Sequence, residues 1–285
     1  MKFSVSVIVV TYNRPLSCKK TISSLLSQSI LPYEIIIVDD ASSKSFEFNH
    51  PLVKVFRNQF ELGLSASRNI GVKVSRGDIV AFIDDDAIAD RDWIKNIEYV
   101  FREYDADIVG GPVFPLFLSK PPEWFDIKQF GWSVGINKKD IIGCNFAAKR
   151  SVFERIGYFD ENLGRKYGKL LSGEESEFLQ RARYANLRVL FMPEIKVHHI
   201  VHPHRLTLYY LMKRVWWQGI TEYYYLLSQP KSFHKAILKL SLKKMVSIAL
   251  SALRILLSPK NRRRGLLTLI LQTGFFYAIF KRRKI

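Results

Sequence analysis

The sequence predicts an α/β fold in which helices flank a mostly parallel central sheet, followed by a helical C-terminal extension that is both basic and apolar. Along the first half of the chain, short and continuously apolar runs alternate with amphipathic segments, as in parallel sheets buried on both faces. The charge distribution separates the extension from the rest. Residues 1–202 contain 27 Lys and Arg against 25 Asp and Glu, whereas residues 203–285 contain 17 against a single acid, Glu222.

The elements of the first half alternate between strand and helix. In chain order we expect a strand at 4–12, a helix at 16–28, strands at 34–40 and 53–58, a helix at 63–77, a strand at 78–86 and a helix at 93–104. This order predicts parallel βαβ units with right-handed crossovers, a nucleotide-binding type of sheet. After an apolar run at 106–114, weak periodicity predicts a loop over 115–136. The sequence has no Gly-x-Gly-x-x-Gly and no Walker motif, which disfavours ordinary dinucleotide and P-loop chemistry.

Composition sets the outer limits. With 285 residues, 48% of them hydrophobic and 13% aromatic, the chain can bury one substantial core and a smaller appendage. The opening MKFSVSVIVV resembles a signal peptide, but the polar TYNRP follows at once without a cleavage site, so we interpret it as the first strand. Cys18 and Cys144 are the only cysteines. They are too few for a disulfide framework or a cysteine zinc site, which fits a reducing compartment.

Three consecutive aspartates, Asp84, Asp85 and Asp86, follow the apolar run at 79–83. Ligands of open α/β sheets bind at the carboxyl ends of the strands, and the side-chain period of two lets Asp84 and Asp86 point to the same side. One interpretation is a divalent cation that carries substrate phosphates, because Mg²⁺ is usually held by one or two carboxylates and phosphate oxygens. The other is a solvated acidic turn that caps a helix.

The extension contains two apolar segments, 245–257 and 265–280, bracketed by the basic clusters 262–264 and 281–284. These segments are shorter than the roughly 20 residues needed to span a bilayer. Apolar helices with cationic flanks suit an interfacial helix pair on an anionic leaflet, where each basic residue adds about 1 kcal/mol. A helical hairpin packed on the catalytic core, a short re-entrant hairpin and RNA binding are the alternatives.

Six segments, in this order, resemble the family 2 glycosyltransferases: VSVIVVTYNRP, EIIIVDDAS, GLSASRNIGVKVSRGDIVAFIDDDAI, GCNFAAKRSVFERIGYFDENLG, GEESEFLQRARYAN and PEIKVHHIVH. The resemblance runs from about residue 4 to about residue 203. It implies an inverting enzyme of the GT-A fold, which is Rossmann-like, with a catalytic domain at 1–205. Residues 1–110 would bind the nucleotide sugar and 111–205 the acceptor, and 206–285 would form the membrane-associating helical region.

The resemblance also implies donor-binding residues. In the family the first strand ends beneath the nucleobase, and an aspartate after the second strand accepts a hydrogen bond from N3–H of uracil or thymine. A basic residue on the helix before the acidic triplet reaches base or phosphate. The corresponding residues here, together with two of the triplet, are Thr11, Tyr12, Arg14, Asp40, Arg68, Asp84 and Asp85. The alternatives are a core position for Tyr12, a cap of the turn into residues 41–43 for Asp40, and a surface position for Arg68.

The acidic triplet occupies the position of the DxD motif of the family, which implies a metal site. Asp86 corresponds to the metal-ligating aspartate, while Asp84 and Asp85 would face the ribose and the sugar or orient the metal shell. His199, six residues after Pro193, resembles a second ligand, and a nitrogen ligand suits Mn²⁺ better than Mg²⁺. The alternative is a histidine packed on a strand. The cation, Mn²⁺ or Mg²⁺, would neutralise the diphosphate leaving group.

The acceptor half is expected to carry the general base. Inversion at the anomeric carbon needs one carboxylate that takes the proton of the acceptor hydroxyl. Family members commonly have Glu-Asp or Asp-Asp where this chain has Glu174-Glu175, and the second residue is the base. The side chain of Glu175 is one methylene longer than that of the aspartate common in the family. It can still accept a proton, but its carboxylate reaches a different position. The acids also suit a helix start, and residues 164–171 resemble a mobile loop that could close over substrate.

The sequence therefore predicts an inverting, metal-dependent glycosyltransferase, peripheral on the cytoplasmic face of the cell membrane. Its donor would be a UDP- or dTDP-linked sugar, and its acceptor a polysaccharide, a lipid-linked glycan or a glycoconjugate, with no nucleic-acid partner. One alternative is a non-catalytic, membrane-tethered nucleotide-sugar-binding protein of the same fold. Another is a metal-dependent nucleotidyltransferase, which would usually present a phosphate loop rich in glycine and lysine near the N-terminus.

Overall fold

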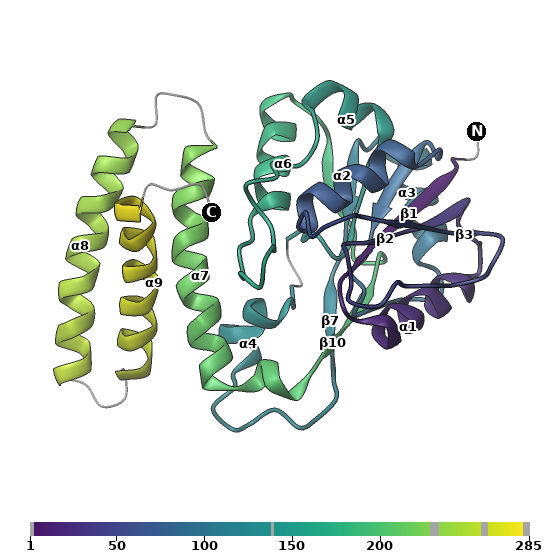
Figure 1. Cartoon of the computed structure of the whole chain (residues 1–285). Helices are drawn as coiled ribbons and strands as arrows, with labels where there is room; N and C mark the ends of the chain where they lie inside the picture. Colours follow the sequence, from purple (N-terminus) through teal and green to yellow (C-terminus); the bar gives the residue numbers. More distant parts are fainter. Residues whose placement is uncertain (1–2, 138–139, 229–233, 258–261, 282–285) are drawn as a thin grey trace. The chain divides into compact units, whose positions relative to one another are not determined.

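The computed structural model describes residues 3–137, 140–228, 234–257 and 262–281 (Figure 1). The chain divides into two compact units. The first, here called the sheet unit, comprises Met1–Glu161 and Glu174–Leu206, and the second, the helical unit, comprises Asn162–Gly173 and Thr207–Ile285. Both cysteines are free and buried in the sheet unit.

A seven-stranded sheet forms the centre of the sheet unit, in the order β3-β2-β1-β4-β8-β6-β9. Its strands are β1 (Val5–Thr11), β2 (Glu34–Asp39), β3 (Val53–Arg57), β4 (Ile79–Phe82), β6 (Ile108–Gly110), β8 (Phe146–Lys149) and β9 (Val189–Phe191). Only β8 runs antiparallel to its neighbours β4 and β6, so the mostly parallel sheet predicted from the sequence is confirmed. Every residue of β2 and of β4 is buried, and this burial on both faces explains why the interior strands are formed by the apolar runs of the sequence.

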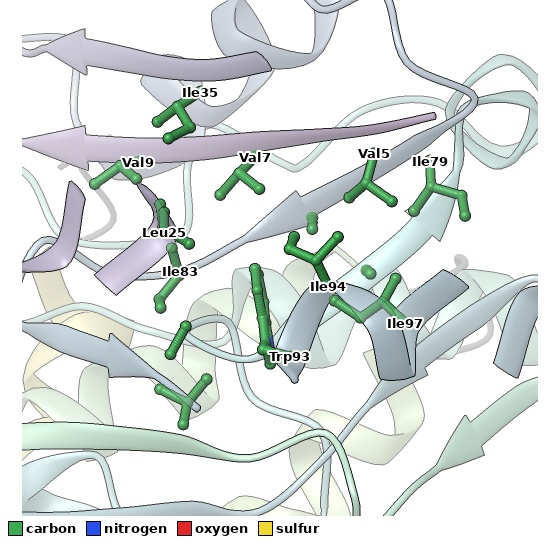
Figure 2. Close-up of a cluster of buried hydrophobic side chains, with 14 of the residues drawn as sticks. Val5, Val7, Val9, Leu25, Ile35, Ile79, Ile83, Trp93, Ile94 and Ile97 are labelled. Atoms are coloured by element: carbon green, nitrogen blue, oxygen red, sulfur yellow. The ribbon is translucent and has the colours of Figure 1, made fainter. Parts of the chain in front are cut away.

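Helices cover both faces of this sheet. They are α1 (Pro15–Leu26), α2 (Leu64–Val74), α3 (Trp93–Glu103), α5 (Arg150–Ile156) and α6 (Glu174–Tyr184). On one face, Val5, Val7 and Val9 of β1 share a core with residues of α1 and α3, among them Leu25 and Trp93 (Figure 2). On the other face, Ile8 of β1 shares a core with α2, α5 and α6. The alternation along β1 thus separates two helical layers.

The prediction of a loop over 115–136 is partly wrong. Strand β7 (Val113–Phe117) continues into this segment, and the helix α4 (Ile127–Phe130) and the 3-10 helix η1 (Gly131–Val134) follow. The strand escaped prediction because its partner is remote in the sequence. β7 pairs in parallel with β10 (Val197–Val201), and β10 pairs antiparallel with β5 (Ala87–Ala89), which makes a second, three-stranded sheet.

This small sheet positions the segment that follows the acidic triplet. In its register His199 of β10 lies opposite Ala87 of β5, the residue directly after Asp86. The backbone N–H of Ile200 donates to the carbonyl oxygen of Asp86 at 2.8 Å. The pairing therefore brings a histidine from late in the chain beside the end of β4. The 3-10 helix η2 (Pro203–Leu206) follows β10 and closes the sheet unit.

The helical unit contains α7 (Leu208–Leu227), α8 (His234–Leu257) and α9 (Arg262–Lys281), with α9 packed against both others. The expected apolar segments 245–257 and 265–280 lie in α8 and α9, whereas residues 282–284 of the last basic cluster lie outside the described residues. Gly219 and Gly274 allow α7 and α9 to approach closely, because a Cβ at either would overlap a backbone carbonyl of the other helix. None of the helices, as far as their residues are described, is long and apolar enough to cross a bilayer.

One buried lysine joins the three helices. Nζ of Lys244 on α8 donates to Oε2 of Glu222 on α7 at 2.6 Å and to Oε1 of Gln272 on α9 at 2.9 Å. The same ammonium lies 4.5 Å from the ring centroid of Phe275. A buried charge is tolerated only when it is paired and hydrogen-bonded, so these contacts fix how the helices align.

Candidate active site

The acidic triplet connects β4 to β5 and is largely removed from solvent. Asp85 and Asp86 are 5% and 2% exposed, and Asp84 is partly buried. The side chain that stands at the N-cap of the next helix, α3, is Asp92 rather than any member of the triplet. The alternative of a solvated, helix-capping turn is therefore wrong, and each of the three carboxylates must be stabilised by the protein around it.

Asp85 is held by residues near the end of β1. The hydroxyl of Thr11 donates to its Oδ2 at 2.8 Å, and Nη1 of Arg14 lies 3.1 Å from its Oδ1. Burial and the adjacent charge of Asp86 raise the pKa of Asp85 to about 6, against the opposing effect of Arg14. Thr11 is thus committed to the triplet, and Arg14 bridges two of its members.

Asp86 lies in a cationic setting. Its Oδ1 is 3.1 Å from Nε2 of His199, and its Oδ2 accepts from Nη2 of Arg205 at 2.7 Å and from Nη1 of Arg14 at 3.0 Å. Burial opposes ionisation, but His199, Arg205 and Arg14 together hold the pKa of Asp86 well below its usual range. The side chain of Asp86 is therefore ionised.

Arg205 is a site residue that the sequence analysis missed. It lies on η2, is 3% exposed, and reaches both Asp86 and, at 3.3 Å through Nη1, the Nε2 of His199. The only signal in the sequence is its place directly after the histidine-rich segment of the last motif. Nothing in the local pattern separates it from the many other basic residues of the C-terminal region.

Asp84, Asp86 and His199 form a group that fits a divalent cation. Each offers a ligand atom, and these atoms lie within 4.8 Å of one another. Nε2 of His199 faces Oδ1 of Asp86 at 3.1 Å, and the buried Nδ1 has no hydrogen-bond partner among the described residues. Two carboxylates and one imidazole nitrogen suit Mn²⁺ or Mg²⁺.

Arg68 lies buried on α2 and links the triplet to α6. Its Nη1 donates to Oε1 of Glu174 at 2.8 Å, and its Nη2 donates to Oδ1 of Asp84 at 3.0 Å and to the carbonyl of Gly143 at 3.2 Å. The alternative of a surface arginine is wrong. A Cβ at position 143 would lie 2.8 Å from Nη1 of Arg68, so the glycine makes room for the guanidinium.

The two glutamates at the start of α6 differ in their surroundings. Glu174 is buried and paired with Arg68, and its Oε2 has no hydrogen-bond partner among the described residues. Glu175 is partly buried, and burial together with the charge of Glu174 raises its pKa to about 8. Both stand in the first turn of the helix, where the helix dipole favours negative charge, so the structural interpretation of this motif also holds.

Asp40 lies at the end of β2, where it organises a loop. Its Oδ1 accepts from Nδ2 of Asn58 and from the backbone N–H of Leu62, both at 2.8 Å, and its Oδ2 accepts from the N–H of Gly63 at 2.9 Å. The alternative that Asp40 caps the turn into residues 41–43 is wrong, because Asp39 accepts from the N–H of Ser42. A carboxylate has about four acceptor sites, so Asp40 can accept one further donor.

Tyr12 follows Thr11 at the end of β1 and is 42% exposed, so its interpretation as a core residue is wrong. The carboxylate of Glu61 raises the pKa of Tyr12, which keeps the hydroxyl protonated. The sequence-predicted residues thus form a network around Asp85 and Asp86, a second network around Arg68, and two positions, Tyr12 and Asp40, at the ends of neighbouring strands.

Residues 6–157 match the sequence model of glycosyl transferase family 2. The chain belongs to this family. It is 32% identical over 238 residues to the glucosyl-dolichyl phosphate glucuronosyltransferase of Haloferax volcanii, an alignment that covers 76% of each chain. It is 27% identical over 235 residues to the succinoglycan biosynthesis protein ExoM of Rhizobium meliloti, covering 76% of this chain and 73% of that protein.

A solved structure shows the same fold as this glycosyltransferase. The mannosyltransferase PcManGT of Pyrobaculum calidifontis, in complex with GDP-Man and Mn²⁺, superposes with a TM-score of 0.64 at 17% identity, covering 99% of this chain and 89% of that one. The GT-A fold predicted for this family 2 glycosyltransferase is confirmed, and the alternative of a nucleotidyltransferase is wrong.

Arg68 and Glu174 provide a test of the network that needs no substrate. In the variant Arg68→Met we expect the free energy of unfolding to fall by about 3–5 kcal/mol, because removing one partner of a buried ion pair leaves an uncompensated charge. The double variant Arg68→Met/Glu174→Gln should recover part of this loss. Urea unfolding followed by circular dichroism measures both.

The matched control is Arg102→Met, which removes an exposed ion pair with Glu103 on α3. It should change stability by no more than about 0.5 kcal/mol, as is usual for surface substitutions. If the double variant instead loses the sum of the two single effects, Arg68 and Glu174 are not coupled.

Proposed function

We propose that this glycosyltransferase moves a sugar from a UDP- or dTDP-linked donor to a hydroxyl of a lipid-linked or other glycan acceptor, with inversion and with a divalent cation. The observation that carries the proposal is the position of Arg68. Its guanidinium contacts Asp84 of the group that fits a cation and Glu174 beside the predicted base. The groups needed to bind a diphosphate and to activate an acceptor therefore adjoin one another within the sheet unit.

Glu175 is the proposed general base. Its carboxylate would take the proton of the acceptor hydroxyl as the hydroxyl oxygen attacks the anomeric carbon on the face opposite the diphosphate. The pKa of about 8 supports this role, because a base works best when its pKa lies near the operating pH. Glu174, fixed by Arg68, raises that pKa and holds the start of α6 in place.

Asp84, Asp86 and His199 would hold the cation. When bound, the cation supplies Lewis-acid neutralisation of the diphosphate leaving group. The chain's own contribution is to orient these three ligands: Arg68 fixes Asp84, and Asp86 accepts from Arg205. The pairing of β5 with β10 brings His199 to the triplet.

Asp40 and Tyr12 support a pyrimidine donor. The remaining acceptor site of Asp40 can receive the N3–H of uracil or thymine, and the exposed ring of Tyr12 offers a surface for a base. The 32% identical relative is named a glucosyl-dolichyl phosphate glucuronosyltransferase, which supports a lipid-linked acceptor for this chain as well.

The helical unit supports the placement of the enzyme at the inner face of the cell membrane. Leu242, Met245, Val246 and Leu250 of α8 recur at helical spacing on one face and are 48–60% exposed. Exposed basic side chains, among them Lys243 and Arg262–Arg264, lie on the same helix pair. Apolar side chains with cationic neighbours are typical of helices that lie on anionic lipid.

Metal dependence can be measured by calorimetry with UDP. We expect UDP to bind at least about tenfold more tightly with Mn²⁺ than in EDTA, within the range usual for coupled ligands (roughly 5–150-fold). Asp86→Asn should abolish the gain, since a ligand carboxylate is lost. Asp105→Asn, an exposed control with a 90% accessible side chain, should keep it. Equal affinity with and without Mn²⁺ in the wild type would refute metal dependence.

The base can be tested by transfer rates at saturating donor. Glu175→Gln keeps the shape but cannot accept a proton, so we expect a loss of about 10²–10⁴ in rate. The affinity for UDP and Mn²⁺ should barely change, and Glu174→Gln should be milder. A collapse in Glu174→Gln with normal turnover in Glu175→Gln would move the base by one residue.

The pH profile provides an independent test of the same residue. Only the ionised carboxylate accepts a proton, and the pKa of Glu175 is raised to about 8. In the wild type, kcat/KM should therefore rise with pH between roughly 7 and 9 and then level off. The residual activity of Glu175→Gln should lack this rise, and an identical rise in both proteins would contradict the assignment.

Membrane binding can be tested by sedimentation with vesicles that contain an anionic lipid. Leu242→Gln/Val246→Gln should weaken binding at least roughly tenfold, because fully burying such side chains is worth about 1.5–3 kcal/mol each. The control Leu31→Gln/Tyr99→Gln changes two exposed apolar residues of the sheet unit and should bind like the wild type. Equal binding of both double variants would remove α8 from the interface.

A further inference from the structure

Each aspartate of the triplet already faces an arginine. The pairs and their N···O distances are Asp84–Arg68 at 3.0 Å, Asp85–Arg14 at 3.1 Å and Asp86–Arg205 at 2.7 Å. All of these side chains except Asp84 and Arg14 are buried. Three guanidinium groups therefore face the triplet before any ligand binds, although Arg68 also pairs with Glu174.

This arrangement is unfavourable for a divalent cation on its own. A dication bound by Asp84, Asp86 and His199 would add two positive charges to a group in which each carboxylate already faces a guanidinium. The guanidinium of Arg205 touches two of these three residues, at 2.7 Å from Oδ2 of Asp86 and 3.3 Å from Nε2 of His199. Like charges at such separations repel strongly where water is excluded.

A diphosphate removes the excess charge and suits the arginines. Its negative charge offsets the dication, and the planar fork of a guanidinium matches the oxygens of a phosphate group. Arg14, with a side chain that is 42% exposed, can turn from Asp85 and Asp86 toward such a ligand. Arg205 lies beside the ligand atoms themselves, where any diphosphate bound to the cation must come close.

We infer that Arg205, assisted by Arg14, makes this site accept a divalent cation only together with the diphosphate of a nucleotide. The inference rests on the proposed function and adds a positioning role that none of the family motifs assigns. Arg205 opposes the cation alone and favours the diphosphate. It therefore biases the enzyme toward binding the two as one unit.

A purely structural role for Arg205 predicts something different. If the residue only neutralised Asp86 to stabilise the fold, its removal would weaken the binding of every ligand or of none. The proposed role predicts changes of opposite sign: tighter binding of the cation alone and weaker binding of the nucleotide alone. A gain in affinity cannot result from damage to the fold.

The experiment measures Mn²⁺ alone and UDP alone in EDTA, with the full chain, by electron paramagnetic resonance and calorimetry. In Arg205→Met we expect Mn²⁺ to bind about tenfold more tightly than in the wild type, and UDP about tenfold more weakly, within the span of typical couplings (roughly 5–150-fold). Arg205→Lys, which keeps the charge, should stay near the wild type for Mn²⁺. Arg14→Met, at a more exposed position, replaces Arg205→Met if that variant does not fold. It should shift both affinities in the same directions.

Arg102→Met removes one positive charge from an exposed ion pair on α3 and is the control for net charge. Weaker or unchanged binding of Mn²⁺ alone in both Arg205→Met and Arg14→Met would overturn the inference. So would a wild type that binds Mn²⁺ as tightly without UDP as with it. Because coupling is reciprocal, UDP would then bind equally with and without Mn²⁺, so metal dependence would fall too, while the donor and base assignments would survive. If Mn²⁺ fails to bind the wild type even with UDP, the metal-dependent function falls as well.

Discussion

The buried guanidinium of Arg68 is the constraint on which the arrangement of the site depends. A charge removed from water costs several kcal/mol unless carboxylates and carbonyls surround it, and Arg68 finds its partners in three separate parts of the chain. Asp84 follows β4, Gly143 precedes β8, and Glu174, 106 residues away from Arg68, begins α6. The need to satisfy one guanidinium therefore fixes the distance between the acidic triplet and the acid pair.

The same requirement explains why the triplet can be buried. Asp85 and Asp86 repel one another, and burial raises the pKa of Asp85 to about 6, yet Asp86 remains ionised because His199 and Arg205 face it. His199 lies on β10 and Arg205 on η2, which follows it, and the pairing of β10 with β5 brings this segment to the triplet. The three-stranded sheet, which also contributes Ala87, Ala89 and Val197 to the core on one face of the main sheet, thus determines the electrostatics of the site. Backbone pairing and charge pairing depend on each other here.

Sequence reasoning was strongest where the signal is local. Continuous apolar runs predicted β1, β2 and β4, and the triplet at the end of β4 marked the site, because burial on both faces and the strand end are encoded in adjacent residues. It failed where partners are distant. β7 has no periodicity of its own and exists through β10, and Arg205 becomes a site residue only through that pairing. The roles of Asp39 and Asp40 in their loops likewise depend on which backbone N–H groups the fold brings near.

Charge neutralisation also governs the helical unit, with a different result. Residues 203–285 contain one acid, Glu222, and its carboxylate is bound to the buried Lys244. Lys244 also donates to Gln272, and these contacts align the three helices. The only acidic side chain in the sequence of 203–285 is therefore already paired. The sequence of 203–285 contains no second acid for its other basic residues. Because the exposed stripe of α8 is apolar at the same time, the partner that satisfies both features is an anionic surface with an apolar interior, which is the physical basis for proposing lipid.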